Sequence, residues 1–162
     1  MRRFLFILAQ LTWGLPQTLV GFVLFLYWLP RVKTRCMYHG AIVTEWTAGG
    51  GISLGLFVFV SERASRYMLD GREMTPEESK SAVRVHEYGH CMQSLLLGPA
   101  YLLLVGLPSY LWANLHALRK LRREKGLSYY AVYPENWANA LGERTTGERS
   151  PGKAMPIRRK AA

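Results

Sequence analysis

Cysteine and acidic residues are both scarce in this chain of 162 residues. Its two cysteines, Cys36 and Cys91, need no bridge in the expected fold, so no disulfide framework is indicated and a reducing compartment is compatible. Only 11 Asp and Glu stand against 21 Lys and Arg, which gives a formal net charge of +10. The chain is also too short for two ordinary domains and has no internal repeat, so its motifs are placed in one unit.

Charged side chains are missing altogether between Phe4 and Leu29, a run rich in Leu, Phe, Val and Trp. As a helix at ~1.5 Å per residue it would reach about 39 Å, which exceeds the ~30 Å of bilayer hydrocarbon. A buried core helix and a cleaved signal peptide are the alternatives, but no small-residue cleavage site follows the run. We therefore expect residues 4–29 to form a transmembrane anchor that is kinked at Pro16.

The excess of positive charge has two interpretations. It could bind nucleic acid, or it could face anionic headgroups beside the membrane segment. The second is simpler here, so membrane lipid is the expected partner and nucleic acid is not. Lys and Arg flank both ends of the apolar run, and their wider excess after it favours a cytoplasmic domain.

Two short runs after the anchor are rich in β-branched and aromatic residues, Ala41 to Trp46 and Ile52 to Val60. A glycine-rich segment, residues 47–51, separates them, and this order predicts a β-hairpin with a glycine loop. The second run is too short to span a bilayer, so we expect a strand that packs against helices.

The clearest helix signal is the sequence Thr75-Pro76-Glu77-Glu78, which combines a capping threonine, a proline at the first helical position and a glutamate three residues after the cap. No strong breaker follows until Gly98-Pro99, so a helix of about 22 residues should start at Pro76. Inside it, His86-Glu87-Tyr88-Gly89-His90 matches the pattern HExxH. The two histidines share one helix face, so both imidazoles can reach one metal ion.

Zinc is the expected ion, because catalytic zinc sites commonly combine three protein ligands with one open position for water. Glu87 would accept a proton from that water and so activate it to attack a carbonyl group. Glu135, 45 residues after His90, is the candidate third ligand, and Asn139 lies one helical turn later, where it could orient a ligand.

Two other side chains are candidates for the same site. His116 could be a ligand or could stabilise the transition state, although a lone histidine on a helix is more commonly a polar surface residue. Tyr130 is a candidate for stabilising the transition state together with its neighbours Tyr129 and Tyr133, although packing is the commoner role of tyrosine.

Residues 95–115 also lack charge, but Gly98-Pro99 and the segment 106–109 interrupt them. If this run crossed the bilayer, the histidines and Glu135 would lie on opposite sides of the membrane and could not share one metal ion there. We therefore expect the run to fold back at residues 106–109 as a membrane-associated hairpin. A helix from Pro108 to Lys125 and a short one from Pro134 to Leu141 should follow, and Gly142 should end the second. Residues 143–162 read as a disordered basic tail.

The motifs resemble those of gluzincins, the thermolysin-like HExxH peptidases in which a second helix supplies a glutamate to the zinc. This resemblance implies zinc ligands at His86, His90 and Glu135, with Glu87 as the base. Residues 83–142 also resemble a group of small bacterial membrane-associated HEYGH proteins, which implies a bacterial inner membrane. The chain departs from the thermolysin pattern at Asn139, where a carboxylate is common, and it has no obvious histidine for the oxyanion.

The sequence therefore predicts an α+β, mainly helical fold with a zincin-like domain at residues 36–142. The leading interpretation is a membrane-anchored zinc-dependent peptidase with a peptide or protein substrate. The alternative is a non-catalytic membrane protein with a structural metal site or a lipid- or partner-binding role. A fourth protein ligand would favour the alternative, and an open position on the metal would favour the peptidase.

Overall fold

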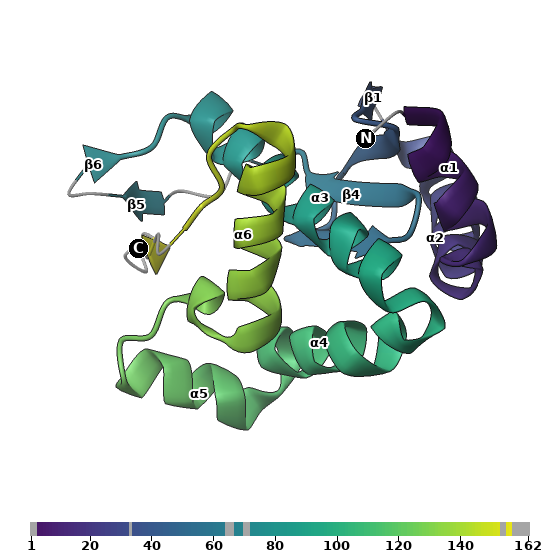
Figure 1. Cartoon of the computed structure of the whole chain (residues 1–162). Helices are drawn as coiled ribbons and strands as arrows, with labels where there is room; N and C mark the ends of the chain where they lie inside the picture. Colours follow the sequence, from purple (N-terminus) through teal and green to yellow (C-terminus); the bar gives the residue numbers. More distant parts are fainter. Residues whose placement is uncertain (1–2, 33, 64–66, 70–71, 153–154, 157–162) are drawn as a thin grey trace.

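Helices surround a small twisted sheet in the computed structural model of this chain, which describes residues 3–32, 34–63, 67–69, 72–152 and 155–156 (Figure 1). The mainly helical α+β class expected from the sequence is confirmed. Two helices, α3 (Pro76–Leu97) and α6 (Tyr133–Thr146), pack side by side at the centre of the molecule and carry the motif residues.

The apolar N-terminal run forms two helices, α1 (Arg3–Thr12) and α2 (Leu15–Trp28), which meet at 96°. The single kinked helix expected over residues 4–29 is corrected here, because Gly14 and Pro16 both weaken helix continuity at the bend. Among the described residues no single helix has the length and apolarity to cross a bilayer, whereas the bent pair meets both criteria together. A short 3₁₀ turn, Leu29–Arg31, follows α2.

Buried polar side chains attach these two helices to α3. The amide of Gln10 donates to the carbonyl oxygen of Cys91 at 3.0 Å, and the amide of Gln17 donates to Ser94 Oγ at 2.7 Å. Phe6 is fully buried and stacks on Tyr88 with 5.6 Å between ring centroids. Residues 3–28 are therefore packed against the motif helix.

The main sheet has the strand order β1 (Thr34–Tyr38), β2 (Ala41–Trp46), β4 (Phe57–Ser61) and β3 (Gly51–Leu54). The hairpin predicted between residues 41–46 and 52–60 is wrong, because the second run itself turns back at Gly55, where φ is +62°. Its second half, β4, pairs in parallel with β2, and its first half, β3, forms the edge of the sheet beside α3. A smaller sheet joins β5 (Tyr67–Leu69), β6 (Arg72–Glu73) and β7 (Met155–Pro156).

Helix α3 begins at Pro76 and ends at Leu97, as predicted. Thr75 Oγ accepts from the backbone N–H of Glu78 at 3.2 Å, and Glu78 Oε2 accepts from the backbone N–H of Thr75 at 2.8 Å. This reciprocal pair satisfies two backbone donors that a helix start leaves without partners. Gly98 ends the helix with a φ of +53°, a conformation that glycine adopts without strain.

The apolar segment after α3 turns at a 3₁₀ turn, Gly98–Ala100, and does not fold back at residues 106–109 as expected. A π-helical turn, Leu102–Gly106, leads directly into α4 (Leu107–Asn114). Pro108 occupies the first turn of α4, where its missing N–H leaves no bond unmade. The predicted helix from Pro108 to Lys125 is instead divided at Leu115, whose extended backbone separates α4 from α5 (His116–Glu124).

Helix α6 follows a 3₁₀ turn, Tyr129–Ala131, and continues to Thr146, four residues beyond the predicted end at Gly142. Gly142 packs against α3, where a Cβ would lie 2.3 Å from the carbonyl oxygen of Val85, so this glycine serves a close approach and not a helix stop. The helix ends at Gly147, which has a φ of +75°. Of the tail expected to be disordered, residues 143–146 belong to α6 and residues 155–156 form β7, whereas residues 153–154 and 157–162 lie outside the described residues.

Candidate metal centre

Helices α3 and α6 come into close backbone contact at Gly89, one residue before the second motif histidine. A Cβ at this position would lie 1.8 Å from the backbone oxygen of Ala138 on α6. Only a residue without a side chain permits this separation. The close crossing brings the motif face of α3 against the first turns of α6, where Glu135 and Asn139 lie.

His86 and His90 on α3 converge with Glu135 on α6. The Nε2 atoms of the two histidines lie 3.1 Å and 3.5 Å from the same carboxylate oxygen, Glu135 Oε2. All three residues are buried, and Glu135 has no exposed surface. The structure thus brings together the three side chains that the sequence nominated as ligands, and they could hold a metal ion.

The two separations between the histidine nitrogens and Glu135 Oε2 fit a tetrahedral metal site, and all three donor atoms lie within 4.8 Å of one another. Zinc bonds of ~2.0–2.1 Å to nitrogen and oxygen place neighbouring ligand atoms about 3.3 Å apart, close to the two observed distances. Glu135 Oε2 is buried and has no hydrogen-bond partner among the described residues. A nearby cation would compensate the charge of this buried carboxylate, and two imidazoles with one carboxylate could supply the ligands of a metal ion.

Two amide side chains orient the imidazoles. Asn139 Oδ1 accepts from His86 Nδ1 at 2.8 Å, and Asn139 Nδ2 donates to the carbonyl oxygen of Gly152 at 3.2 Å, which fixes the amide orientation. Gln93 acts in the same way: its Oε1 accepts from His90 Nδ1 at 2.6 Å and its Nε2 donates to the carbonyl oxygen of Pro134 at 2.8 Å. Both histidines therefore carry a proton on Nδ1 and direct Nε2 at Glu135.

Asn139 occupies the orienting position expected from the sequence, whereas Gln93 was missed. The position of Gln93 in the sequence could have identified it, because a residue three positions after His90 lies on the same face of the helix.

The electrostatics of the pocket favour a positive charge between these groups. Burial lowers the pKa of His90, but the adjacent Glu135 carboxylate outweighs burial and raises this pKa to about 9. Burial raises the pKa of Glu135, but the two adjacent imidazoles hold it well below its usual range. Two lone pairs and an ionised carboxylate would repel one another unless a proton or a metal ion lies between them.

The other oxygen of Glu135 is held from α4. Ser109 Oγ donates to Glu135 Oε1 at 2.5 Å, and this contact ties the apolar segment to the metal ligand. Ser109 was not predicted from the sequence, because it lies 26 residues before Glu135 and no local pattern connects the two.

Glu87 lies outside the ligand group and faces the edge strand β3. Ser53 Oγ donates to Glu87 Oε2 at 2.7 Å, and a Cβ at Gly51 would lie 2.1 Å from Glu87 Oε1. The bare backbone at Gly51 therefore makes room for the carboxylate, and Ser53 fixes its orientation. These two contacts explain why β3 lies directly beside the motif helix.

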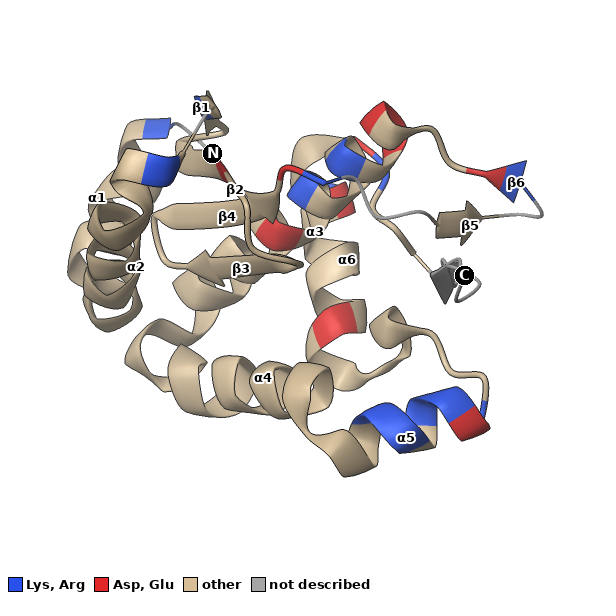
Figure 2. Ribbon diagram, turned by 180° about the vertical axis from the view of Figure 1, so that it is seen from behind, with Lys and Arg blue, Asp and Glu red and all other residues tan. Residues whose placement is uncertain are grey.

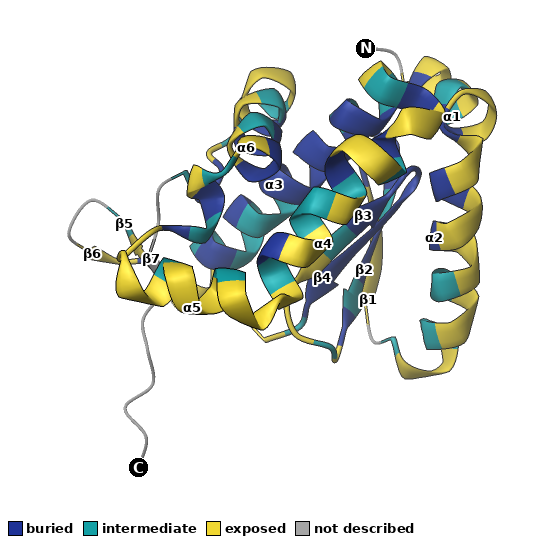
Figure 3. Ribbon diagram, turned by 90° about the horizontal axis from the view of Figure 1, so that it is seen from below, coloured by how far each residue is buried: buried dark blue, intermediate teal, exposed yellow. Residues whose placement is uncertain are grey.

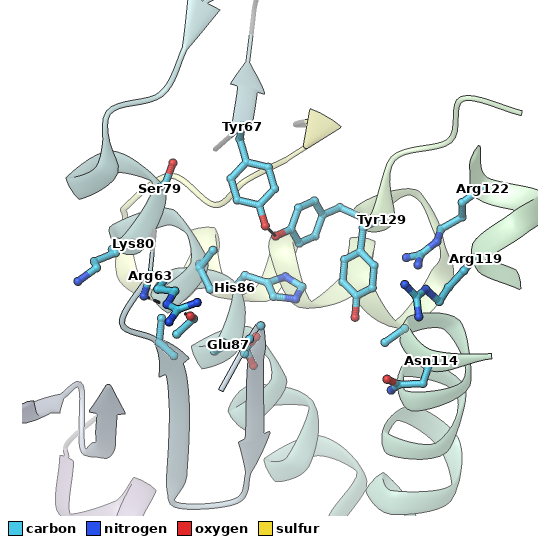
Figure 4. Close-up of a pocket in the computed structure, with 18 residues that line it drawn as sticks. Arg63, Tyr67, Ser79, Lys80, His86, Glu87, Asn114, Arg119, Arg122 and Tyr129 are labelled. Atoms are coloured by element: carbon cyan, nitrogen blue, oxygen red, sulfur yellow. Dashed lines mark hydrogen bonds between the residues drawn. The ribbon is translucent and has the colours of Figure 1, made fainter. Parts of the chain in front are cut away.

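A cleft opens beside this group in two halves of about 540 Å³ and 380 Å³. Both are lined by His86, Glu87 and Gly51, as well as by Tyr129 at the other wall. Figure 4 shows His86 and Glu87 near the middle of the larger half, with Tyr129 beside them. His86 and Glu87 thus line both halves and His90 lines the smaller one, whereas Glu135 is fully buried and belongs to neither lining.

Tyr130 and His116 have different surroundings. The ring of Tyr130 lies 4.9 Å from the ring of His86, and its hydroxyl lies 3.0 Å from that of Tyr67. Burial raises the pKa of Tyr130 well above its ordinary value, so it stays protonated and can donate a hydrogen bond. His116 is exposed at the start of α5 and supplies no ligand atom to the three-residue group.

Comparison of the chain with protein-family models, with curated proteins and with solved structures gave no match. The function is therefore argued from the site itself.

Proposed function

We propose that this protein is a zinc-dependent peptidase that works at a membrane surface. The observation that carries the proposal is the convergence of His86, His90 and Glu135, whose donor atoms are close enough together to bind one metal ion. The two histidines lie beside a cleft that Glu87 also lines. Two imidazoles, a carboxylate ligand and a neighbouring carboxylate base are the groups that metal-assisted hydrolysis requires.

A catalytic role is favoured over a structural one by the number of ligands. Structural zinc sites usually have four protein ligands, often including cysteine. The group found among the described residues has three members, and His86 and His90 both line the cleft. A site with three protein ligands leaves one coordination position for water or substrate.

When bound, zinc would supply Lewis acidity, which lowers the pKa of water and polarises a carbonyl group. Glu87, held by Ser53, would accept the proton of the attacking water at its carboxylate and pass it to the leaving nitrogen. Tyr130, kept protonated by burial, lines the larger half of the cleft and could donate to the oxygen on which negative charge develops.

The proposed membrane contact rests on exposed apolar side chains. Figure 3 shows exposed residues along the outer surface of α1 and α2 and again on α4. The most exposed large apolar side chains on these helices and in the turns that adjoin them are Phe4, Trp13, Val23, Tyr27, Leu103 and Tyr110. Water-soluble monomers rarely expose large contiguous apolar patches, so we assign these faces to lipid.

The decisive experiment compares wild-type protein with Glu87→Gln in detergent, using metal analysis and hydrolysis of a fluorescently labelled casein. Glu87→Gln should keep the bound zinc and lose hydrolysis, because the carboxamide cannot accept the proton. His86→Ala should lose the zinc as well.

Hydrolysis by Glu87→Gln at the wild-type rate would remove Glu87 from the mechanism. Zinc without any wild-type hydrolysis would instead favour a structural metal.

A further inference from the structure

The two halves of the cleft differ sharply in charge. Among the described residues, the larger half is lined by four basic side chains and by one acidic residue, Glu87. The basic residues are Arg63, Lys80, Arg119 and Arg122. The described residues that line the smaller half include no Lys or Arg. Its walls are mainly apolar and include Ile52, Leu54, Leu102, Leu107 and Tyr110.

The basic residues stand on both sides of the metal centre. Figure 4 shows Arg63 and Lys80 on one side of His86, and Arg119 and Arg122 on the other. They come from the segment after β4, from α3 and from α5, whose basic residues are blue in Figure 2. Separate segments thus place positive charge in one half of a single cleft.

Two of these cations are partly engaged and two are exposed. Lys80 lies 3.3 Å from Glu45, and the guanidinium of Arg122 lies over the rings of Trp112 and Tyr129. Arg63 and Arg119 are exposed and can reach a bound ligand. An anionic group entering this half meets four positive charges, whereas a cationic group would be repelled.

The edge strand β3 and the glycine loop that precedes it together line both halves. Gly49, Gly50 and Gly51 line the basic half, and the stretch Gly51–Leu54 lines the apolar half. An extended peptide lying beside an edge strand would therefore place residues in each half, with its middle at His86 and Glu87.

We propose that the substrate is a peptide with acidic side chains on one side of the cleaved bond and apolar side chains on the other. The acidic side chains bind in the half lined by the four cations, and the apolar ones bind against Leu102 and Leu107. This inference rests on the proposed peptidase function and specifies its substrate class. An anionic lipid headgroup is the competing ligand for the basic half.

The test measures binding separately from catalysis. Zinc-loaded Glu87→Gln in detergent is titrated into three labelled peptides that share the same apolar half. The other half of the peptide is acidic (Asp and Glu), neutral (Asn and Gln) or basic (Lys). Both orders of the two halves are used. The acidic peptide should bind about tenfold more tightly than the neutral one, and the Lys peptide more weakly than either. Added salt should reduce this preference.

Charge-reversal variants then test whether the basic residues of the cleft cause the preference for the acidic peptide. Arg63→Glu combined with Arg119→Glu should abolish the advantage of the acidic peptide and improve binding of the Lys peptide. The matched control, Arg123→Glu with Lys125→Glu, changes charge by the same amount on exposed residues outside the cleft lining and should keep the preference. Equal zinc content in all variants shows that the site is intact.

Equal affinities for the three peptides, or a preference that survives the charge reversal, would overturn the inference. If short-chain phosphatidylglycerol displaces bound peptide and the three peptides bind equally well, the basic half binds lipid. If wild-type protein hydrolyses none of the peptides, the proposed function fails, and the binding data still decide which ligand the cleft selects.

Discussion

Replacement of Gly89 by alanine tests whether the close helix crossing creates the metal site. The added Cβ would lie 1.8 Å from the backbone oxygen of Ala138, and contacts of this kind do not fall below about 3.0 Å. Helix α6 must therefore move by about 1.2 Å, and Glu135 moves with it. Metal–ligand distances tolerate only about 0.2 Å, so the three donors can no longer bind one ion together.

Thermal unfolding with and without zinc measures this effect. At a free zinc concentration 100 times its dissociation constant, binding stabilises by about 2.7 kcal/mol, which raises the Tm of a domain of this size by about 5–11 °C. Wild-type protein should show this rise in Tm and Gly89→Ala should not. In the metal-free state, overpacking should also lower the unfolding free energy of Gly89→Ala by about 1–3 kcal/mol relative to the wild type.

Gly106→Ala is the matched control, because its new Cβ has no neighbour nearer than 3.7 Å. It should respond to zinc as wild-type protein does. A Gly89→Ala protein with the wild-type zinc response would refute the link between the helix crossing and the site.

Three further predictions follow from other contacts. Gln93→Leu and Asn139→Leu should each weaken zinc binding about 10–100-fold in chelator competition, because each histidine loses the acceptor that orients it. Arg72 lowers the pKa of Glu78 from 4.5 to about 2, so the stability that Glu78 contributes is present above pH 4.5 and lost as the pH falls to about 2; the difference in unfolding free energy from Glu78→Gln should shrink over that range. Leu103→Glu should reduce flotation with lipid vesicles, because this 71%-exposed side chain lies on the proposed lipid face, and unchanged flotation would argue against that face.

Local signals in the sequence were sufficient for the motif helix. The cap at Thr75 and the break at Gly98 set the limits of α3, and helical periodicity placed His86 and His90 on one face. Glu135 was found through its resemblance to a known arrangement. Its convergence with the histidines depends on Gly89 and Gly142, whose roles become visible only when α3 and α6 are packed together.

Features that depend on distant contacts were not predictable from local patterns. The parallel pairing of β2 with β4 needs strands that are separated by another strand in the sequence, and the run from Ile52 to Val60 looks continuous although it contains a turn at Gly55. The 96° bend between α1 and α2 lies within a uniformly apolar run, where hydrophobicity alone indicates one helix. The basic half of the cleft combines residues from three separate segments.

X-ray absorption spectroscopy at the zinc K-edge, with metal quantification of the purified wild-type protein, tests the metal centre most directly. We predict one zinc per chain, two imidazole nitrogens and carboxylate or water oxygen at ~2.0–2.1 Å, and loss of the metal in Glu135→Ala. This account would be contradicted if protein purified in the presence of zinc contained no metal. It would also be contradicted if the zinc were bound through sulfur, or if Glu135→Ala bound zinc as well as the wild type does.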